Sequence, residues 1–169
     1  MSKEFRIYKP QRDKKGAASK WQCSTKIKKV KGKSYPELML FLEIAPQTGV
    51  DKDGNATFDW GNDGEAIIVK LGTADIGEFL LVADGKKEAV GPPKASDRKV
   101  ELGLFHQTPK GNTTIRFYIR NKMFYIAVSR QRDGKVIRHG HAVTPAEATV
   151  LSVLLKDFLV KCYDWNIKS

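Results

Sequence analysis

The order of secondary structure along the chain is the feature that most constrains its fold. Four strand-like segments precede one helix, and the same order then occurs a second time without obvious sequence identity between the halves. Alternating apolar and polar residues mark the strands, and polar turns rich in glycine and lysine separate them. This order predicts an α+β domain in which two halves, each a four-stranded antiparallel sheet plus a helix, pack through a helical layer.

The boundaries follow from each local pattern, and residues 1–169 are expected to form a single domain. In the first half, about 4–84, the pattern predicts strands at 4–9, 18–30, 37–46 and 65–72. Thr73 is expected to cap the helix that follows, and Asp84-Gly85 to end it. An exposed loop at 84–98 leads to the second half, about 99–165, with strands expected at 99–106, 113–120, 123–131 and 135–143.

The second helix has several independent start signals. Thr144-Pro145-Ala146-Glu147 is a capping box with proline at the first helical position. An apolar stripe follows at helical spacing, and it is a candidate oligomer core. The stripe consists of Val150, Leu151, Leu154, Leu155 and Phe158.

Two strands show which kind of sheet to expect. One side of Leu38 to Ile44 is wholly aliphatic, whereas in Ile115 to Arg120 one side carries Arg116, Tyr118 and Arg120. Each sheet should therefore have one face in water. Arginines that flank an aromatic ring on an exposed sheet face are what single-strand binding requires.

The positive charge is concentrated at the N-terminal end. The chain has 30 Lys and Arg against 19 Asp and Glu, a net charge of +11. Residues 1–35 hold twelve basic and two acidic side chains, which is +10 of that total. Phe5, Ile7 and Trp21 lie in this segment, so it should be folded rather than a disordered arm. A folded basic surface favours a polyanionic partner such as nucleic acid.

A single strand offers unstacked bases and one phosphate per nucleotide, so its binding site needs aromatic rings and cations. For any single residue, the alternative is that the ring belongs to the core or that the cation only solvates a surface. Phe117 and Phe124 alternate with aliphatic neighbours and are expected in the core. The candidate nucleic-acid-binding residues are Tyr8, Lys15, Trp21, Lys26, Lys28, Phe41, Arg116, Tyr118, Arg120, Tyr125, Arg130 and Arg138.

Motifs for catalysis, cofactors and membranes are missing from the sequence. It contains no P-loop, nucleophile elbow or H-E-x-x-H motif, so we expect no enzymatic activity, no cofactor and no small-molecule substrate. His139 and His141 could share one side of a strand, but no third ligand is evident and we expect no metal. Cys23 and Cys162 lack C-x-x-C spacing, and no apolar run could span a membrane. We therefore expect an intracellular soluble protein, cytoplasmic or nucleoid-associated, or organellar or nuclear in a eukaryote.

Several motifs occur in the same order as in a known family. Leu38 to Pro46 followed by Gly49-Val50 resembles an aliphatic strand with an A-P-x-x-G-V turn, and Phe58-Asp59-Trp60 resembles the motif Y-D-W. The chain thus resembles the Whirly family of single-stranded DNA-binding proteins over about residues 5–165. Further matching segments are Leu71 to Gly77, Phe105-His106, Met123 to Val128, Val143 to Leu151 and Tyr163-Asp164-Trp165.

The resemblance implies a homotetramer with helices at its centre and sheets radiating outward. It also implies binding of single-stranded DNA with little sequence specificity, in DNA maintenance, repair or transcription. Two alternatives remain open. One is a single-stranded RNA-binding or annealing factor, as in the related kinetoplastid guide-RNA proteins, and the other is a transcription coactivator that acts mainly through protein contacts.

Overall fold

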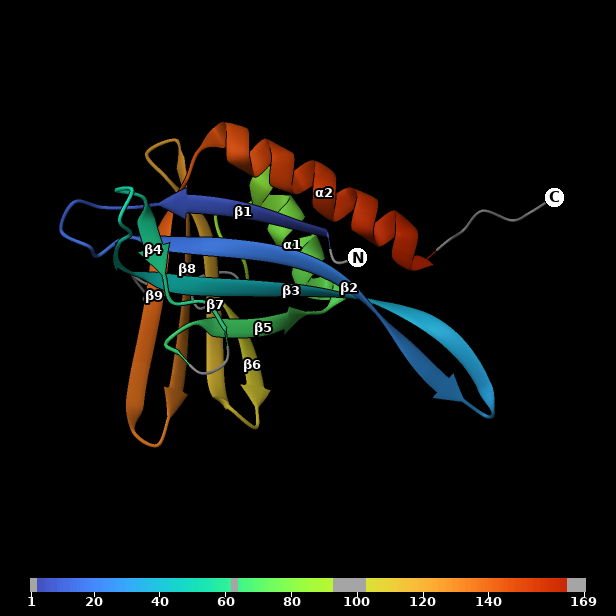
Figure 1. Cartoon of the computed structure of the whole chain (residues 1–169). Helices are drawn as coiled ribbons and strands as arrows, with labels where there is room; N and C mark the ends of the chain where they lie inside the picture. The colour runs from blue at the N-terminus through green and yellow to red at the C-terminus, as the bar shows by residue number, and fades with distance from the viewer. Residues whose placement is uncertain (1–2, 62–63, 93–102, 164–169) are drawn as a thin grey trace.

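The first sheet is built around two long paired strands. The computed structural model describes residues 3–61, 64–92 and 103–163. β1 (Lys3–Lys9) pairs with β2 (Ala17–Val30), and β2 pairs with β3 (Lys33–Val50), all antiparallel (Figure 1). The free edge of β3 then pairs with β5 (Ile67–Leu71) and, further along, with the short β4 (Ala56–Phe58). The four predicted strands are confirmed, and β4 is an addition to them.

The second sheet is a simple antiparallel meander. Its strands are β6 (Leu104–Thr108), β7 (Gly111–Arg120), β8 (Met123–Arg132) and β9 (Lys135–Val143), in that order. The predicted turn between β8 and β9 is present, with Asp133 and Gly134 both at positive φ. Of the predicted strand 99–106, residues 99–102 lie outside the described residues.

The two helices follow the sheets as predicted, with one correction at a cap. α1 (Thr73–Ala83) is capped by Gly72 rather than by Thr73, because the Asp75 carboxylate accepts a hydrogen bond from the Gly72 N–H at 2.7 Å. α2 (Pro145–Tyr163) has the predicted capping box, with Thr144 and Glu147 bonded to each other's backbone N–H at 2.8 and 3.2 Å. Neither helix is long and apolar enough to cross a membrane.

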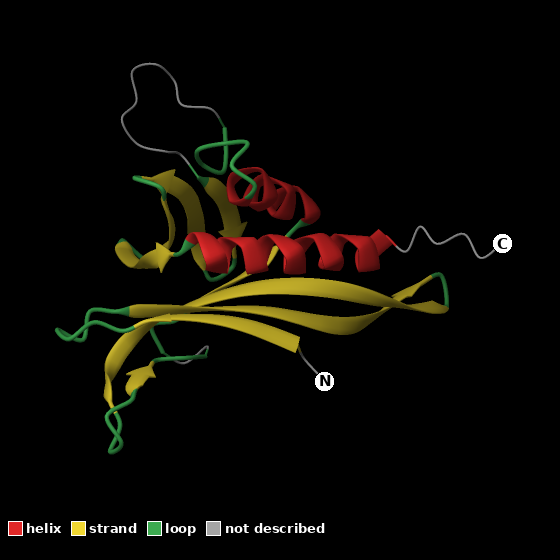
Figure 2. Cartoon of the chain, turned by 90° about the horizontal axis from the view of Figure 1, so that it is seen from above, coloured by secondary structure: helices red, strands yellow, loops and turns green. Residues whose placement is uncertain are grey.

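Both helices lie on one face of the first sheet, and the second sheet packs on that same side (Figure 2). Phe79 of α1 joins the sheets: its ring lies 5.1 Å from Trp21 and 5.0 Å from Phe117. Phe117 in turn stacks on Phe124 at 5.7 Å, which confirms the core placement expected for both. The core is therefore continuous between the two halves, as in an α+β fold.

The segment that follows α1 differs from the exposed loop that was predicted. Val90 is buried, its N–H donates to the Phe117 carbonyl at 2.9 Å, and the Ile119 N–H donates to the Glu88 carbonyl at 2.8 Å. The segment thus continues the edge of the second sheet beyond β6, because β7 extends past the end of that strand. Residues 93–98 of the predicted loop lie outside the described residues.

Candidate nucleic-acid interface

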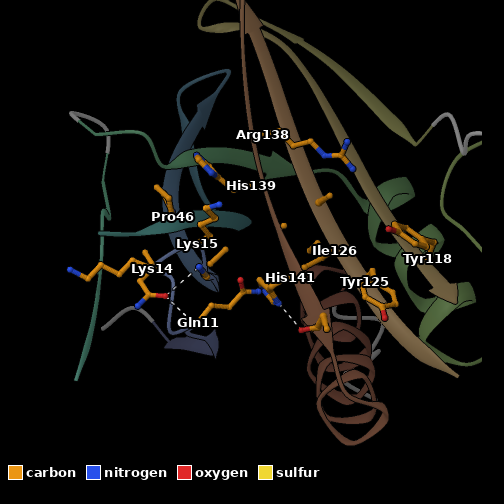
Figure 3. A pocket seen from close by; sticks show the side chains of 16 residues that line it. Gln11, Lys14, Lys15, Pro46, Tyr118, Tyr125, Ile126, Arg138, His139 and His141 are labelled. Carbon is orange, nitrogen blue, oxygen red and sulfur yellow. Dashed lines mark hydrogen bonds between the residues drawn. The ribbon is translucent and has the colours of Figure 1, made fainter. Parts of the chain in front are cut away.

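A groove of about 590 Å³ lies between the two sheets, where the β1–β2 loop faces strands β7 to β9 (Figure 3). Figure 3 shows lysines on the loop side and tyrosines on the side of the second sheet. One wall consists of Gln11, Lys14, Lys15, Gly16, Ala17, Pro46 and Gln47. The other consists of Tyr118, Tyr125, Ile126, Ala127, Arg138, His139, Gly140, His141 and Ala142.

A buried amide fixes the shape of the lysine wall. The Gln47 side-chain oxygen accepts hydrogen bonds from the backbone N–H groups of Gln11 and Gly16 at 2.8 and 3.3 Å. A Cβ at position 16 would lie 2.4 Å from the Lys9 carbonyl oxygen and 2.5 Å from that same amide oxygen. Only glycine fits there. The loop is therefore held against β3, and Lys14 and Lys15 are presented at the groove.

The opposite wall carries a pair of stacked tyrosines. Tyr118 and Tyr125 are cross-strand partners whose ring centroids lie 5.5 Å apart, with 19° between the ring planes. Ala127 and Gly140 line the groove beside them with little side-chain bulk, and a Cβ on Gly140 would lie only 2.8 Å from the Ile126 carbonyl oxygen. Small residues beside a half-exposed aromatic pair leave room for a planar group to lie on the rings.

The two histidines of the groove serve the packing of the sheets. The His139 ring nitrogen Nε2 lies 2.7 Å from the Glu65 carbonyl oxygen, which comes from the first half of the chain. His141 donates through Nδ1 to the Ala142 carbonyl at 2.8 Å, and its Nε2 is buried without a partner. Burial lowers the pKa of His141, so the ring is held neutral. No cluster of three metal-ligating side chains occurs within the part of the chain that the structure describes.

An aromatic cluster lies beside the groove on the face of the first sheet turned away from the helices. Tyr8 lies 5.6 Å from Phe58 and 6.4 Å from Trp60, and the Lys20 ammonium lies 5.2 Å from the Trp60 ring. Lys20 also pairs with the buried Glu43, whose carboxylate accepts the Gly61 N–H at 2.7 Å. Because the Asp59 N–H donates to the carbonyl of Pro46, the cluster is attached directly to the lysine wall.

Comparison with known proteins gives similarity in structure alone. No protein-family model and no curated protein matches the chain. The crystal structure of WHY1 from Arabidopsis thaliana is similar with a TM-score of 0.71 and 18% identity, over 98% of this chain and 87% of that one. The plant transcriptional regulator PBF-2 is similar with a TM-score of 0.69 and 19% identity, over 98% and 84%. Both are Whirly proteins.

The chain has the Whirly fold. A guideRNA-binding protein complex bound to a gRNA is also similar, with a TM-score of 0.60 and 13% identity over 100% of this chain and 96% of that one. The fold class predicted from the sequence is therefore confirmed.

The Whirly fold brings some of the predicted residues together and separates others. Lys15, Tyr118, Tyr125 and Arg138 line the groove, and Arg116 and Arg120 share the Tyr118 face of β7. Tyr8 belongs to the aromatic cluster beside the groove. Three more lie away from the groove on the first sheet: Phe41 is half-buried on β3, and Lys26 and Lys28 lie towards the far end of β2.

Two predicted binding residues lie on the core-facing sides of their strands; the burial of Trp21 corrects its prediction, whereas Arg130 is half-buried and its assignment stays a prediction. Trp21 is 4% exposed and packs edge-on against Phe79, so neither ring face is open to a base. The Arg130 guanidinium donates to the Ile68 carbonyl at 2.6 Å and to the Thr113 hydroxyl at 3.0 Å. It thereby ties β8 to β5 of the other sheet, and its removal from water lowers its pKa.

Sequence reasoning also missed several side chains of this surface. Lys14 lines the groove, and Arg6, Lys20, Phe58 and Trp60 build the aromatic cluster. Phe58-Asp59-Trp60 could be recognised as a motif. Its place beside Tyr8 could not, because β4 has only three residues and shows no alternation.

Proposed function

We propose that the chain binds single-stranded DNA with little sequence specificity, and that the groove is the principal site. The observation that carries this proposal is the position of the Tyr118–Tyr125 stack across the groove from Lys15. Bases would stack on the tyrosines, and Lys15 and Arg138 would hold the phosphates. Neither of these two cations has an ion-pair partner among the described residues, so both are available to an anionic ligand.

The chemistry of the groove accounts for weak base discrimination. Every base has a π-face, so stacking contributes about 1–3 kcal/mol per base whatever the sequence. Phosphate contacts are equally independent of sequence. Arg116, Arg120, Tyr8 and Phe41 extend the same kind of surface beyond the groove on the two sheets. Because binding by stacking needs unstacked bases, this surface selects single strands over duplex.

The exposed apolar side of α2 supports a homotetramer. Leu151, Leu155 and Phe158 of the predicted stripe are buried, but Val150 and Leu154 are 46% and 43% exposed. Val153 and Val160 are exposed further, at 61% and 69%. Valine and leucine on one exposed helix are typical of a contact between protomers. Light scattering should give a tetramer mass, and replacing Val153 and Val160 by aspartate should lower it.

The proposal is tested by titrating labelled oligonucleotides with the purified protein at two salt concentrations. We expect much tighter binding to a single strand than to a blunt duplex of the same sequence, and weaker binding at higher salt. Equal affinity for duplex would contradict the proposal, since the tyrosines would then have no unstacked base to contact.

Single-stranded RNA is a second candidate ligand, because one structure with a similar fold is a guideRNA-binding complex bound to its RNA. Competition between DNA and RNA oligonucleotides of matched sequence separates the two, since only a contact to the 2′-hydroxyl distinguishes them. A regulator acting through protein contacts is a third, because PBF-2 is a transcriptional regulator. Function retained after neutralising Lys15 and Arg138 would favour that candidate.

A further inference from the structure

The hairpin formed by β2 and β3 projects beyond the body of the molecule (Figures 1 and 2). We call its end, residues 25–36, the arm; every residue in it is exposed. Its strands stay in regular antiparallel register from Thr25 opposite Leu38 to Val30 opposite Lys33. The turn residues Lys31 and Gly32 both have positive φ, as the tight hairpin turns that match strand twist require. The arm is thus a regular ribbon.

The arm carries uncompensated positive charge. It contains five lysines, Lys26, Lys28, Lys29, Lys31 and Lys33, and no acidic residue. None of the five forms an ion pair within residues 3–61, 64–92 and 103–163. Elsewhere the fold compensates such charges: Lys9 pairs with Glu147, Lys20 with Glu43 and Lys156 with Asp84. Five neighbouring cations repel one another, and a polyanion would relieve that repulsion.

The distribution of these lysines suits a groove with two phosphate walls. Successive strand residues point to opposite faces, and cross-strand partners share a face. Three lysines, Lys26, Lys28 and Lys33, therefore lie on one side of the ribbon, and Lys29 lies on the other. A single strand presents one line of phosphates and would meet one side only. The major groove of B-DNA, about 12 Å wide, admits a two-stranded ribbon and has a phosphate backbone on either side. The six residues from Thr25 to Val30 give the arm a reach of roughly 20 Å.

We propose that the arm enters the major groove of duplex DNA that adjoins the bound single strand, so that the chain prefers junctions between single-stranded and double-stranded DNA. This inference rests on the proposed single-strand binding in the groove between the sheets. Ala17 lines that groove, and the arm begins at Thr25, eight residues further along β2. The two sites are therefore roughly 27 Å apart along the strand. Only a junction whose single-stranded part spans this separation can contact the groove and the arm at the same time.

The test compares three kinds of DNA: a single strand, a blunt duplex, and partial duplexes with single-stranded overhangs of increasing length. We expect the wild-type chain to bind a long-overhang junction about tenfold or more tighter than the isolated overhang, because three or more phosphate contacts are added. Short overhangs should show no such gain. The gain identifies a duplex contact in addition to the single-strand contact.

The arm variant is Lys28→Gln/Lys31→Gln/Lys33→Gln. It should lose the higher affinity for the long-overhang junction and keep its affinity for the single strand. The log–log salt slope on the junction should fall by about 0.9 per lost contact, roughly 2.7 in all. The matched control, Lys52→Gln/Lys86→Gln/Lys122→Gln, removes the same charge from exposed positions outside the arm and should keep the gain. All six substitutions are at exposed sites, so thermal melting should confirm that both variants fold.

Three outcomes overturn the inference. In the first, the wild-type chain binds the junction and the isolated overhang with equal affinity. In the second, the arm variant loses as much affinity for the single strand as for the junction. In the third, the arm variant has a changed mass in solution. The last would make the arm a contact between protomers. Failure of the wild-type chain to bind any single strand would refute the proposed function itself, which is a different result from intact single-strand binding without a junction gain.

Discussion

Truncating Tyr125 should weaken single-strand binding without changing its salt dependence. The Tyr125 ring stacks on Tyr118 at 5.5 Å and is half-buried, so part of it faces the groove. A base that stacks there contributes about 1–3 kcal/mol, which corresponds to a rise in Kd of roughly 5- to 150-fold for Tyr125→Ala. Stacking releases no counterion, so the slope of log Kd against log salt should stay at the wild-type value.

The same substitution has a smaller, separable effect on stability. An aromatic pair contributes about 0.5–1.5 kcal/mol beyond the area that it buries. For a chain of 169 residues, each kcal/mol shifts Tm by about 2–4 °C, so the variant should melt a few degrees lower and remain folded at 25 °C. Tyr125→Phe keeps the ring and is the matched control, and it should bind like the wild type.

Fluorescence anisotropy of a labelled oligonucleotide at four salt concentrations measures both quantities in one experiment. A folded Tyr125→Ala variant with wild-type affinity would remove Tyr125 from the site. The same result for Tyr118→Ala would refute the stacking mechanism, because the pair would then be only a packing contact between β7 and β8.

Further predictions concern charge, packing and pH. Lys15→Gln and Arg138→Gln should each weaken single-strand binding and lower the salt slope by about 0.7, measured in the same titrations. Trp21→Ala should lower the free energy of unfolding in urea by about 3–5 kcal/mol. Its folded fraction, measured by stoichiometric titration with oligonucleotide, should bind the single strand with unchanged affinity. Burial lowers the pKa of His141, so the unfolded chain binds a proton that the folded chain excludes. The stability that His141 contributes should be complete above its ordinary pKa of about 6.5 and fall as the pH drops towards 5. His141→Gln should lack this part of the loss when unfolding midpoints are compared across that range.

Local sequence patterns were sufficient to predict the structure wherever one segment determines its own conformation. The capping box at Thr144 and Glu147 closes as the sequence predicts, because both partners lie within one turn. The alternation in β7 places Ile115 and Phe117 in the core and Arg116 and Tyr118 on the other face. These features depend on spacing that is visible within a few residues.

The interior position of Trp21 depends on a distant part of the chain. On β2, Trp21 shares its face with Ser19 and Cys23, which do not mark that face as core. The side is decided by Phe79 of α1, whose ring contacts the indole. Arg130 is different, since alternation along β8 places it with the buried Ile126 and Val128. That signal was present in the sequence, and only the carbonyl partner Ile68 comes from the other sheet.

The N-terminal excess of positive charge separates into parts once the fold is known. Lys9 and Lys20 are compensated by Glu147 and Glu43, which the sequence places in other elements, so a count over residues 1–35 overstates the free charge on the sheet. Apart from Lys3 on β1, the uncompensated cations of this segment among the described residues then lie in the loop before β2, where Lys15 lines the groove, and in the arm at the other end of β2. Between these two groups, Lys20 on β2 is neutralised by Glu43. This separation of the free charges favours two separate phosphate contacts over one continuous line of contacts along the strand. The stacked tyrosines of the groove assign the single strand to one end of β2, and the arm, which has lysines on both faces, leaves the duplex for the other end.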